Sequence, residues 1–216
     1  FKRLLSELNP DVINVHNIKQ AFWGPEIVGV CAEYAPTVWT LHDMSSFTGR
    51  CIHALDCEGY LTGCGESCQS RHIPFIIPRS LTQKRWSDNK TVIDTHPDLV
   101  AVCPSQWLAN KAKNSSWIKN RVEVIPNGID LSLFTPIQMK KAREKLGLPG
   151  NGLLFLMVAM DINSRLKGGL LLQKALELVT QKQFSLITVG GKKTYSSFKN
   201  SEIEMYSLGH IESGMM

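Results

Sequence analysis

The chain has 216 residues, 43% of them hydrophobic, and this length suits one large domain or two small ones with buried cores. Its 24 Lys and Arg residues against 19 Asp and Glu residues give a net charge of 24 − 19 = +5. The cations are dispersed and do not alternate with aromatic residues, so a nucleic-acid partner is not expected. No apolar stretch approaches the roughly 20 residues that a membrane-spanning helix needs.

Four short apolar strands are predicted in the first half of the chain. They comprise residues 11–16, 37–42, 99–103 and 122–125. Between the last two, Ser105 can cap a helix that carries Trp107, Leu108 and Ala112. Because strands alternate with helices, we expect a parallel sheet with right-handed crossovers.

A joint rich in Pro, Gly and charge separates the two halves. Residues 131–152 contain Pro136, a charged helical segment at 140–145, Gly147 as its stop, and a Pro-Gly-Asn-Gly turn at 149–152. We therefore expect part of a separate doubly wound sheet on each side.

The second half repeats the alternation of strand and helix. The apolar run at 153–160 has the pattern of a strand buried on both faces, and a second buried strand is predicted at 184–189. A helix is predicted at 169–182 between them. Its expected apolar face comprises Leu171, Leu172, Ala175, Leu176 and Val179.

Both ends of the sequence look cut. Residues 1–8 start inside an amphipathic helical pattern with no cap before it, and the sequence stops just after a strand-like and a loop-like segment. No basic, apolar and small-residue leader opens the chain. We therefore expect an internal piece of a longer protein.

Two cations follow the strand predicted at 153–160. In the phrase SRLKGG at 164–169, Arg165 and Lys167 lie between that strand and the start of a helix, where open α/β sheets bind ligands. The free N–H groups and positive dipole end of the helix face the same space. Together they would suit a diphosphate, although spacing alone leaves open a solvated turn with two chance cations.

Two histidines end predicted strands. His16 follows the first strand and His42 ends the second, and a histidine can donate or accept a hydrogen bond near neutral pH. A packing role against neighbouring backbone is the alternative for each. Asp43 could orient His42 or cap a helix.

Several phrases carry a resemblance to a known family. VEVIPNGID at 122–130, closed by Phe134 and Pro136, and SRLKGG at 164–169 resemble the retaining glycosyltransferases of family 4, also called group 1. These enzymes have the α/β GT-B architecture of two Rossmann-like domains with parallel sheets, and both domains would be incomplete here. The implied parts are the end of the N-terminal acceptor domain (1–134), a linker with a short helix (135–152) and the start of the C-terminal donor domain (153–216).

The resemblance implies a hexosyltransferase. Such enzymes move a sugar from a UDP- or GDP-linked donor to a saccharide or lipid-linked acceptor, with retention, in polysaccharide or glycoconjugate biosynthesis. They need no metal or other cofactor for the chemistry. We expect a cytoplasmic protein in peripheral contact with the inner face of the membrane. Two alternatives stay open: another GT-B enzyme such as a nucleotide-sugar epimerase, and a non-enzymatic zinc-binding module.

The resemblance also suggests how the donor is held. Lys167 and Gly168 match the family's "R…KG" phrase, which holds the donor diphosphate. Arg165 is offset, because many members place this arginine directly after the strand, where this chain has Met160. The N-terminal Gly-rich loop and the paired glutamates of the family are missing, so we expect this piece alone to be inactive.

On the other side of the expected cleft, the phrase TLHD resembles members that build surface polysaccharides. It assigns His42 the contact with the transferred sugar, which makes His42 the candidate catalytic residue. His16, in PDVINVHN, lies on the acceptor side. Asn127 and Gly128 are expected to form a tight turn at the cleft, since Gly tolerates a positive φ and Asn bonds back to its own backbone.

Four cysteines fall within 18 residues, separated by five, six and three residues. They are Cys51, Cys57, Cys64 and Cys68. They could close a structural zinc site, although none of the gaps is the two-residue spacing of a zinc ribbon. Disulfides, which need an oxidising compartment, and unlinked thiols remain open. Cys31 and Cys103 lie in apolar contexts and are expected in the core.

Overall fold

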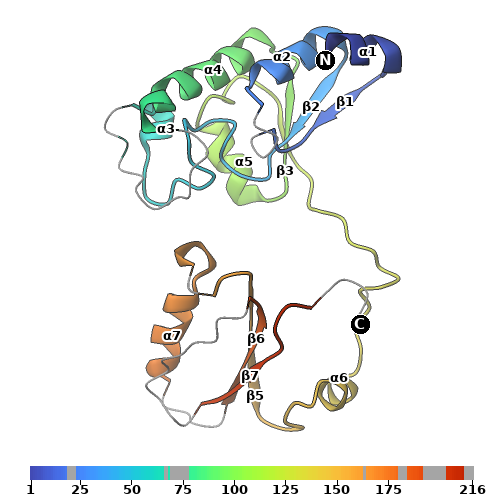
Figure 1. Cartoon of the computed structure of the whole chain (residues 1–216), viewed down its shortest axis with the longest axis vertical. Coiled ribbons are helices and arrows are strands. Elements are labelled where there is room, and N and C mark those ends of the chain that lie inside the picture. Colours follow the sequence, from blue (N-terminus) through green and yellow to red (C-terminus); the bar gives the residue numbers. More distant parts are fainter. Residues whose placement is uncertain are drawn as a thin grey trace. The chain divides into compact units, whose positions relative to one another are not determined.

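The computed structural model describes residues 1–18, 23–65, 68, 78–162, 164–179, 184–191 and 203–211. The chain divides into two compact units, Phe1–Ile129 and Asp130–Met216. Each unit contains a parallel sheet and helices (Figure 1). The segment expected as a linker, residues 135–152, belongs to the second unit.

Four parallel strands form the sheet of the first unit, in the order β1-β2-β3-β4. They are β1 (Ile13–Val15), β2 (Thr37–Thr40), β3 (Val100–Cys103) and β4 (Val122–Val124). All four match the predicted strands, and each is shorter at one or both ends. Because neighbouring strands run parallel and in register, their carboxyl ends lie along one edge of the sheet.

Helices connect these strands. They are α1 (Lys2–Leu8), α2 (Glu26–Tyr34), α3 (Gly59–Thr62), the 3₁₀ turn η1 (Arg79–Leu81), α4 (Thr82–Thr95) and α5 (Gln106–Lys113). α5 begins as predicted, because the Ser105 hydroxyl accepts a hydrogen bond from the Leu108 N–H at 3.3 Å. α2 and α4, which pack against each other, escaped prediction. The buried residues of α4 are Thr82, Asn89 and Ile93, so this helix has no apolar stripe to recognise.

Aromatic side chains fill the core of the first unit. Trp39 of β2 meets Trp117 edge-on, with ring centroids 5.8 Å apart. Phe47 packs against Tyr60 with centroids 5.6 Å apart. The indole N–H of Trp117 donates to the hydroxyl oxygen of Ser46 at 3.1 Å, so the polar atom of this buried ring is satisfied. The loop that follows β2 therefore contributes directly to the core.

The second unit has its own parallel sheet in the order β5-β6-β7. Its described elements are α6 (Met139–Lys145), β5 (Leu153–Ala159), the 3₁₀ turn η2 (Arg165–Lys167), α7 (Gly169–Glu177), β6 (Phe184–Gly190) and β7 (Glu204–Ser207). The guanidinium of Arg143 donates to the carbonyls of Pro149 at 2.9 Å and Gly152 at 3.0 Å. These bonds tie α6 to the segment that enters β5.

Strand β5 is not buried on both faces, contrary to expectation. Phe155 and Met157 pack against the core of the second unit. Leu156 and Val158, which point the opposite way, are 63% and 62% exposed. A continuous apolar run allows burial on both faces, but the described residues cover only one of them.

The buried face of α7 also differs from the predicted one. Leu172 and Leu176, four residues apart, pack against the core of the unit, whereas Leu171 and Ala175 are exposed. Val179 lies beyond the last residue of the helix and is exposed. Successive helical residues point about 100° apart, so the predicted stripe was too wide to face one layer.

Among the described residues, none of the helices combines the length and the apolar character that crossing a membrane requires.

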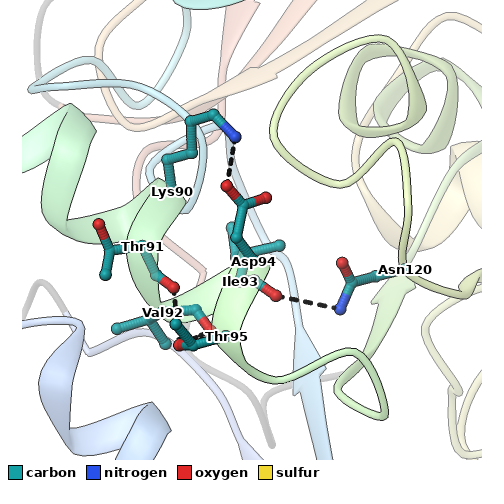
Figure 2. Close-up of polar contacts among 7 residues, drawn as sticks. All are labelled: Lys90, Thr91, Val92, Ile93, Asp94, Thr95 and Asn120. Atoms are coloured by element: carbon teal, nitrogen blue, oxygen red, sulfur yellow. Dashed lines mark hydrogen bonds and ion pairs between the residues drawn. The ribbon is translucent and has the colours of Figure 1, made fainter.

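One side-chain amide closes the C-terminal end of α4. The amide nitrogen of Asn120 donates to the backbone carbonyls of Ile93, His96 and Leu99 at 3.4, 2.9 and 3.2 Å. Figure 2 shows its approach to the Ile93 carbonyl. Asn120 is buried, so its loss would leave these carbonyls without this donor and out of reach of bulk water.

Replacing Asn120 with Asp tests this closure. The substitution keeps the shape of the side chain but presents acceptor oxygens to three carbonyls. We expect it to lower the free energy of unfolding, measured by urea denaturation, by about 3 kcal/mol. The control is Lys90→Ala, which removes the partly exposed ion pair with Asp94 drawn in Figure 2 and should change stability by less than about 1 kcal/mol. Equal effects of the two variants would contradict the role of Asn120.

Candidate functional site

Two histidines meet at the carboxyl edge of the first sheet. His16 directly follows β1 and His42 lies two residues beyond β2, and the parallel pairing of Val15 with Trp39 brings these strand ends level. Nδ1 of His16 and Nε2 of His42 are 2.9 Å apart, and the two rings stack with centroids 5.2 Å apart. Both side chains are exposed. The structure thus brings together two candidate residues from separate sequence motifs.

The histidine pair borders a small hollow of about 10 Å³ that is partly open to solvent. Thr40 lines this hollow, and its hydroxyl donates to Oδ1 of Asn14 on the neighbouring strand at 2.9 Å. Oδ1 of Asp43 accepts a hydrogen bond from the Ser45 N–H at 2.7 Å. The expected helix cap at Asp43 is wrong, because turns and bends follow it and the side chain closes one of these turns.

The loop after β2, residues 41–54, is held by a polar residue of α4. Asn89 is 1% exposed, and its amide nitrogen donates to the carbonyls of Ser45 at 2.9 Å and Thr48 at 3.1 Å. These bonds satisfy loop carbonyls that are buried against the core. The segment that begins with His42 is therefore fixed to α4.

The predicted diphosphate-binding phrase lies between β5 and α7, as expected from the sequence. The Lys167 N–H donates to the Ser164 carbonyl at 3.0 Å and closes the turn η2. Gly168 is the N-cap of α7 with φ of +74°, a conformation that favours glycine. The Lys167 side chain is exposed, whereas the side chain of Arg165 lies outside the described residues. The lysine and the first N–H groups of α7 together make a positive helix start.

Asn127 and Gly128 do not form the expected tight turn. Both are exposed in an irregular segment, and Gly128 is absent from the described glycines with positive φ. The turn comes later, where Oδ1 of Asp130 accepts hydrogen bonds from the hydroxyl and the N–H of Ser132 at 2.6 and 2.8 Å. These two bonds, the hydroxyl first, lower the pKa of Asp130. The carboxylate of Asp130 accepts from two donors of Ser132, so the chain turns here and not at Asn127-Gly128.

A ring pair that the sequence did not reveal lies at the same edge of the sheet. Trp107, at the start of α5 just beyond β3, stacks on His53 with ring centroids 5.1 Å apart. Nδ1 of His53 accepts a hydrogen bond from the Leu55 N–H at 3.0 Å, which orients the ring. Trp107 is 48% exposed. His53 lies in a loop without periodicity, so no sequence signal connects it to Trp107.

The four clustered cysteines all line one cavity of about 40 Å³. The pKa of Cys64 is raised to about 11, chiefly by burial and to a lesser degree by the charges of Cys51, Cys68 and Cys57, while a hydrogen bond from the Gly49 N–H acts in the opposite direction. Within the part of the chain that the structure describes, no three His, Cys, Asp or Glu side chains are arranged as the ligands of a metal ion. The zinc site therefore stays a prediction.

With this geometry established, comparison with known proteins identifies the family. The model of Glycosyltransferase Family 4 matches residues 1–133, which include the first sheet, the histidine pair and all four clustered cysteines. The chain belongs to glycosyltransferase family 4.

Two known proteins are similar to this family-4 chain over part of their length. It is 33% identical over 117 residues to the putative colanic acid biosynthesis glycosyl transferase WcaC of Escherichia coli (strain K12), covering 52% of this chain and 28% of that protein. It also matches the structure of sucrose-phosphate synthase from Thermosynechococcus elongatus with a TM-score of 0.59 and 16% identity, covering 98% of this chain and 48% of that one. This likeness establishes the GT-B fold. The family-4 chain thus spans about half the length of that solved relative.

Gly49 tests how closely the loop after β2 must approach its neighbours. A Cβ there would lie 2.2 Å from the Thr82 carbonyl oxygen and 3.0 Å from Cβ of Cys64. Gly49→Ala should therefore lower the free energy of unfolding by about 1–3 kcal/mol in a denaturant titration. The control is Gly65→Ala, whose Cβ would have no described atom within 4 Å and which should cost less than about 1 kcal/mol. A Gly49→Ala variant as stable as the control would show that the close contact relaxes without cost.

Proposed function

We propose that this chain is part of an enzyme that moves a sugar from a nucleotide diphosphate donor to a saccharide or lipid-linked acceptor, with retention of configuration. The observation that carries the proposal is the His16–His42 pair at the carboxyl edge of a family-4 sheet. Open parallel sheets bind their ligands beyond this edge. Imidazole rings can donate to or accept from sugar hydroxyls near neutral pH.

The hydrogen bond between the two imidazole rings gives them different roles in the proposed reaction. One nitrogen of the bond must donate and the other accept, so Nδ1 of His16 and Nε2 of His42 share one proton. This bond fixes the orientation of His42 and directs its Nδ1 away from His16. In the proposed reaction, Nδ1 of His42 contacts a hydroxyl of the transferred sugar. His16 positions His42 and lies towards the acceptor.

For the donor, the proposal rests on Lys167 and the start of α7. As the bond between the sugar C1 and the diphosphate oxygen breaks, negative charge grows on the leaving phosphate. The exposed Lys167 ammonium and the N–H groups that follow Gly168 can stabilise that charge. They would do the work that a metal ion does in other transferases, so no catalytic cofactor is proposed. Arg165 is a secondary candidate because of its place in η2.

The proposed transfer needs no covalent intermediate on the protein. The acceptor hydroxyl oxygen bonds to C1 on the face from which the diphosphate leaves. Its proton passes to the departing phosphate oxygen, and the nucleoside diphosphate is released. The role of the chain is then to position both substrates and to stabilise the charge of the leaving group.

The biological setting is proposed from the relatives. The name of WcaC refers to colanic acid biosynthesis, which supports a place in polysaccharide or glycoconjugate assembly. A cytoplasmic location with peripheral contact at the inner membrane face fits the net charge of +5, because that leaflet is anionic. A non-enzymatic zinc module is not favoured, since the family match covers the cysteine loop together with the sheet.

A donor panel tests the proposed function in the full-length protein. UDP- and GDP-linked hexoses are supplied one at a time, with and without saccharide and lipid-linked acceptors, and released nucleoside diphosphate is measured. We expect release with one class of donor and an increase when the acceptor is added. Epimerised donor without release, or no turnover with any donor, would contradict the proposal.

Lys167→Ala tests the diphosphate contact. Loss of one preorganised cation should reduce kcat/KM by about 30- to 1,000-fold, equivalent to about 2–4 kcal/mol of transition-state stabilisation. The control is Lys174→Ala, which removes an exposed lysine from the last turn of the same helix and should leave kcat/KM nearly unchanged. Wild-type turnover in Lys167→Ala would remove this residue from the site.

His42→Ala tests the sugar contact. We expect kcat to fall about 30-fold, the scale of one lost hydrogen bond to a reacting group, while the Kd of the nucleoside diphosphate stays within about twofold. The reason is that the proposed nucleotide contacts belong to the second unit and His42 to the first. Kinetics and isothermal titration measure the two quantities. Parallel losses of turnover and nucleotide binding would point to a structural role for His42.

A further inference from the structure

The cavity between the clustered cysteines has no lining residue in common with the hollow beside the histidines. We propose that this cavity binds one Zn²⁺ through four thiolates and that the metal has a structural role. The ligands are Cys51, Cys57, Cys64 and Cys68, all of which line the cavity.

The size and chemistry of the cavity suit a metal ion. Its volume of about 40 Å³ is far below the roughly 300–1,000 Å³ of pockets that bind small molecules. Among the described residues that line it there is no carboxylate and no imidazole, so sulfur is the dominant ligand type. A soft set of four sulfur ligands selects Zn²⁺ or an iron–sulfur cluster over Mg²⁺ and Ca²⁺. It also closes a tetrahedral shell, which leaves no position for substrate.

The surroundings of the sulfurs suit negative charge. The Gly49 N–H hydrogen-bonds to the sulfur of Cys64, as backbone donors do around metal-bound thiolates. The absence of a side chain at Gly49 permits this approach. Arg50 is 7% exposed and lines the same cavity. Because Zn²⁺ with four thiolates carries a net charge of 2 − 4 = −2, a buried guanidinium beside it offsets part of that charge.

Binding requires the sulfurs to move closer together. In the described part of the chain they surround the cavity without forming a ligand set. Rotation about a single χ1 moves a cysteine sulfur by about 3 Å, which is comparable to the Zn–S distance of about 2.3 Å. Cys51 is buried, Cys64 and Cys68 are half-buried, and Cys57 is exposed, so three of the four have room to rotate. Four protons leave as the metal binds.

The proposed zinc would fix the far end of the loop after β2. Cys51 belongs to that loop, its carbonyl accepts a hydrogen bond from the Thr48 hydroxyl, and the Met44 N–H donates to the Ile52 carbonyl at 2.9 Å. Cys57 and Cys64 flank α3, whose Tyr60 carbonyl accepts a hydrogen bond from the indole of α4. One metal would thereby join the loop, the two ends of α3 and Cys68.

Metal analysis tests the proposal independently of any enzymatic assay. The full-length protein is purified without chelator, and elemental analysis should find one zinc per chain. Serine variants of each of the four cysteines should retain less than about a tenth of it, whereas the control Cys31→Ala, a buried cysteine outside the loop, should retain it all. Iron in place of zinc, no metal, two disulfides in the unreduced protein, or full retention by the four serine variants would overturn the proposal.

Cobalt substitution decides the case in which the serine variants fail to fold. Co²⁺ in the wild-type protein should show the visible absorption of a tetrahedral thiolate site. Cys68→His supplies a nitrogen ligand at one position and should still bind one Co²⁺, with thiolate-to-metal absorption lower by about a quarter. An unchanged spectrum in Cys68→His would exclude Cys68 as a ligand and overturn the four-sulfur site. Because zinc content is measured directly, its failure is distinguishable from failure of the glycosyltransferase proposal.

Discussion

The parallel register of β1 and β2 is the constraint on which the candidate site depends. Val15 pairs with Trp39, so the residues that follow the two strands leave the sheet at one level. Leu41 extends β2 by one residue, because its N–H still bonds to β3 and its side chain is buried, and His42 then turns outward towards His16. A slip of one residue would direct the two imidazoles to opposite faces and abolish their contact.

Buried polar residues of the first unit position the loop after β2 and the end of α4. Asn89 holds the loop after β2 through two carbonyls, and Asn120 holds the end of the same helix through three. A hydrophobic contact tolerates small shifts, whereas a buried amide is satisfied only at particular distances and angles. These amides therefore help to determine where the loop lies, and the aromatic residues around Trp39 belong to the hydrophobic core beneath it.

The sequence predicted the elements that depend on local pattern and missed those that depend on distant partners. Runs of Val and Ile located the strands, and the position of His16 and His42 at strand ends placed both at one edge. Their direct contact could not be predicted, because a hydrogen bond across 26 residues depends on the register of the strands. Helix α4 was missed for a similar reason: its three buried residues, Thr82, Asn89 and Ile93, give no apolar periodicity, and Asn89 is buried because it bonds to loop carbonyls. Asn127-Gly128 is a good local turn signal, but the turn forms a few residues later, where the carboxylate of Asp130 accepts two hydrogen bonds from Ser132.

The loop after β2 connects the histidine pair with the cysteine cavity, and different contacts hold its two ends. Its first residue, Leu41, is held by a hydrogen bond to β3, its middle is held by Asn89, and its last residues border the cysteine cavity. His42 leaves the sheet only two residues beyond β2, so its position depends on strand pairing. The segment from Phe47 to Ala54 is largely buried and is held by hydrogen bonds of Thr48 to Asn89 and Cys51, so a metal in the cavity would add a crosslink at its end. A metal in the cavity would therefore reinforce the end of the loop that carries the cysteines, whereas the position of the histidine pair depends on the sheet.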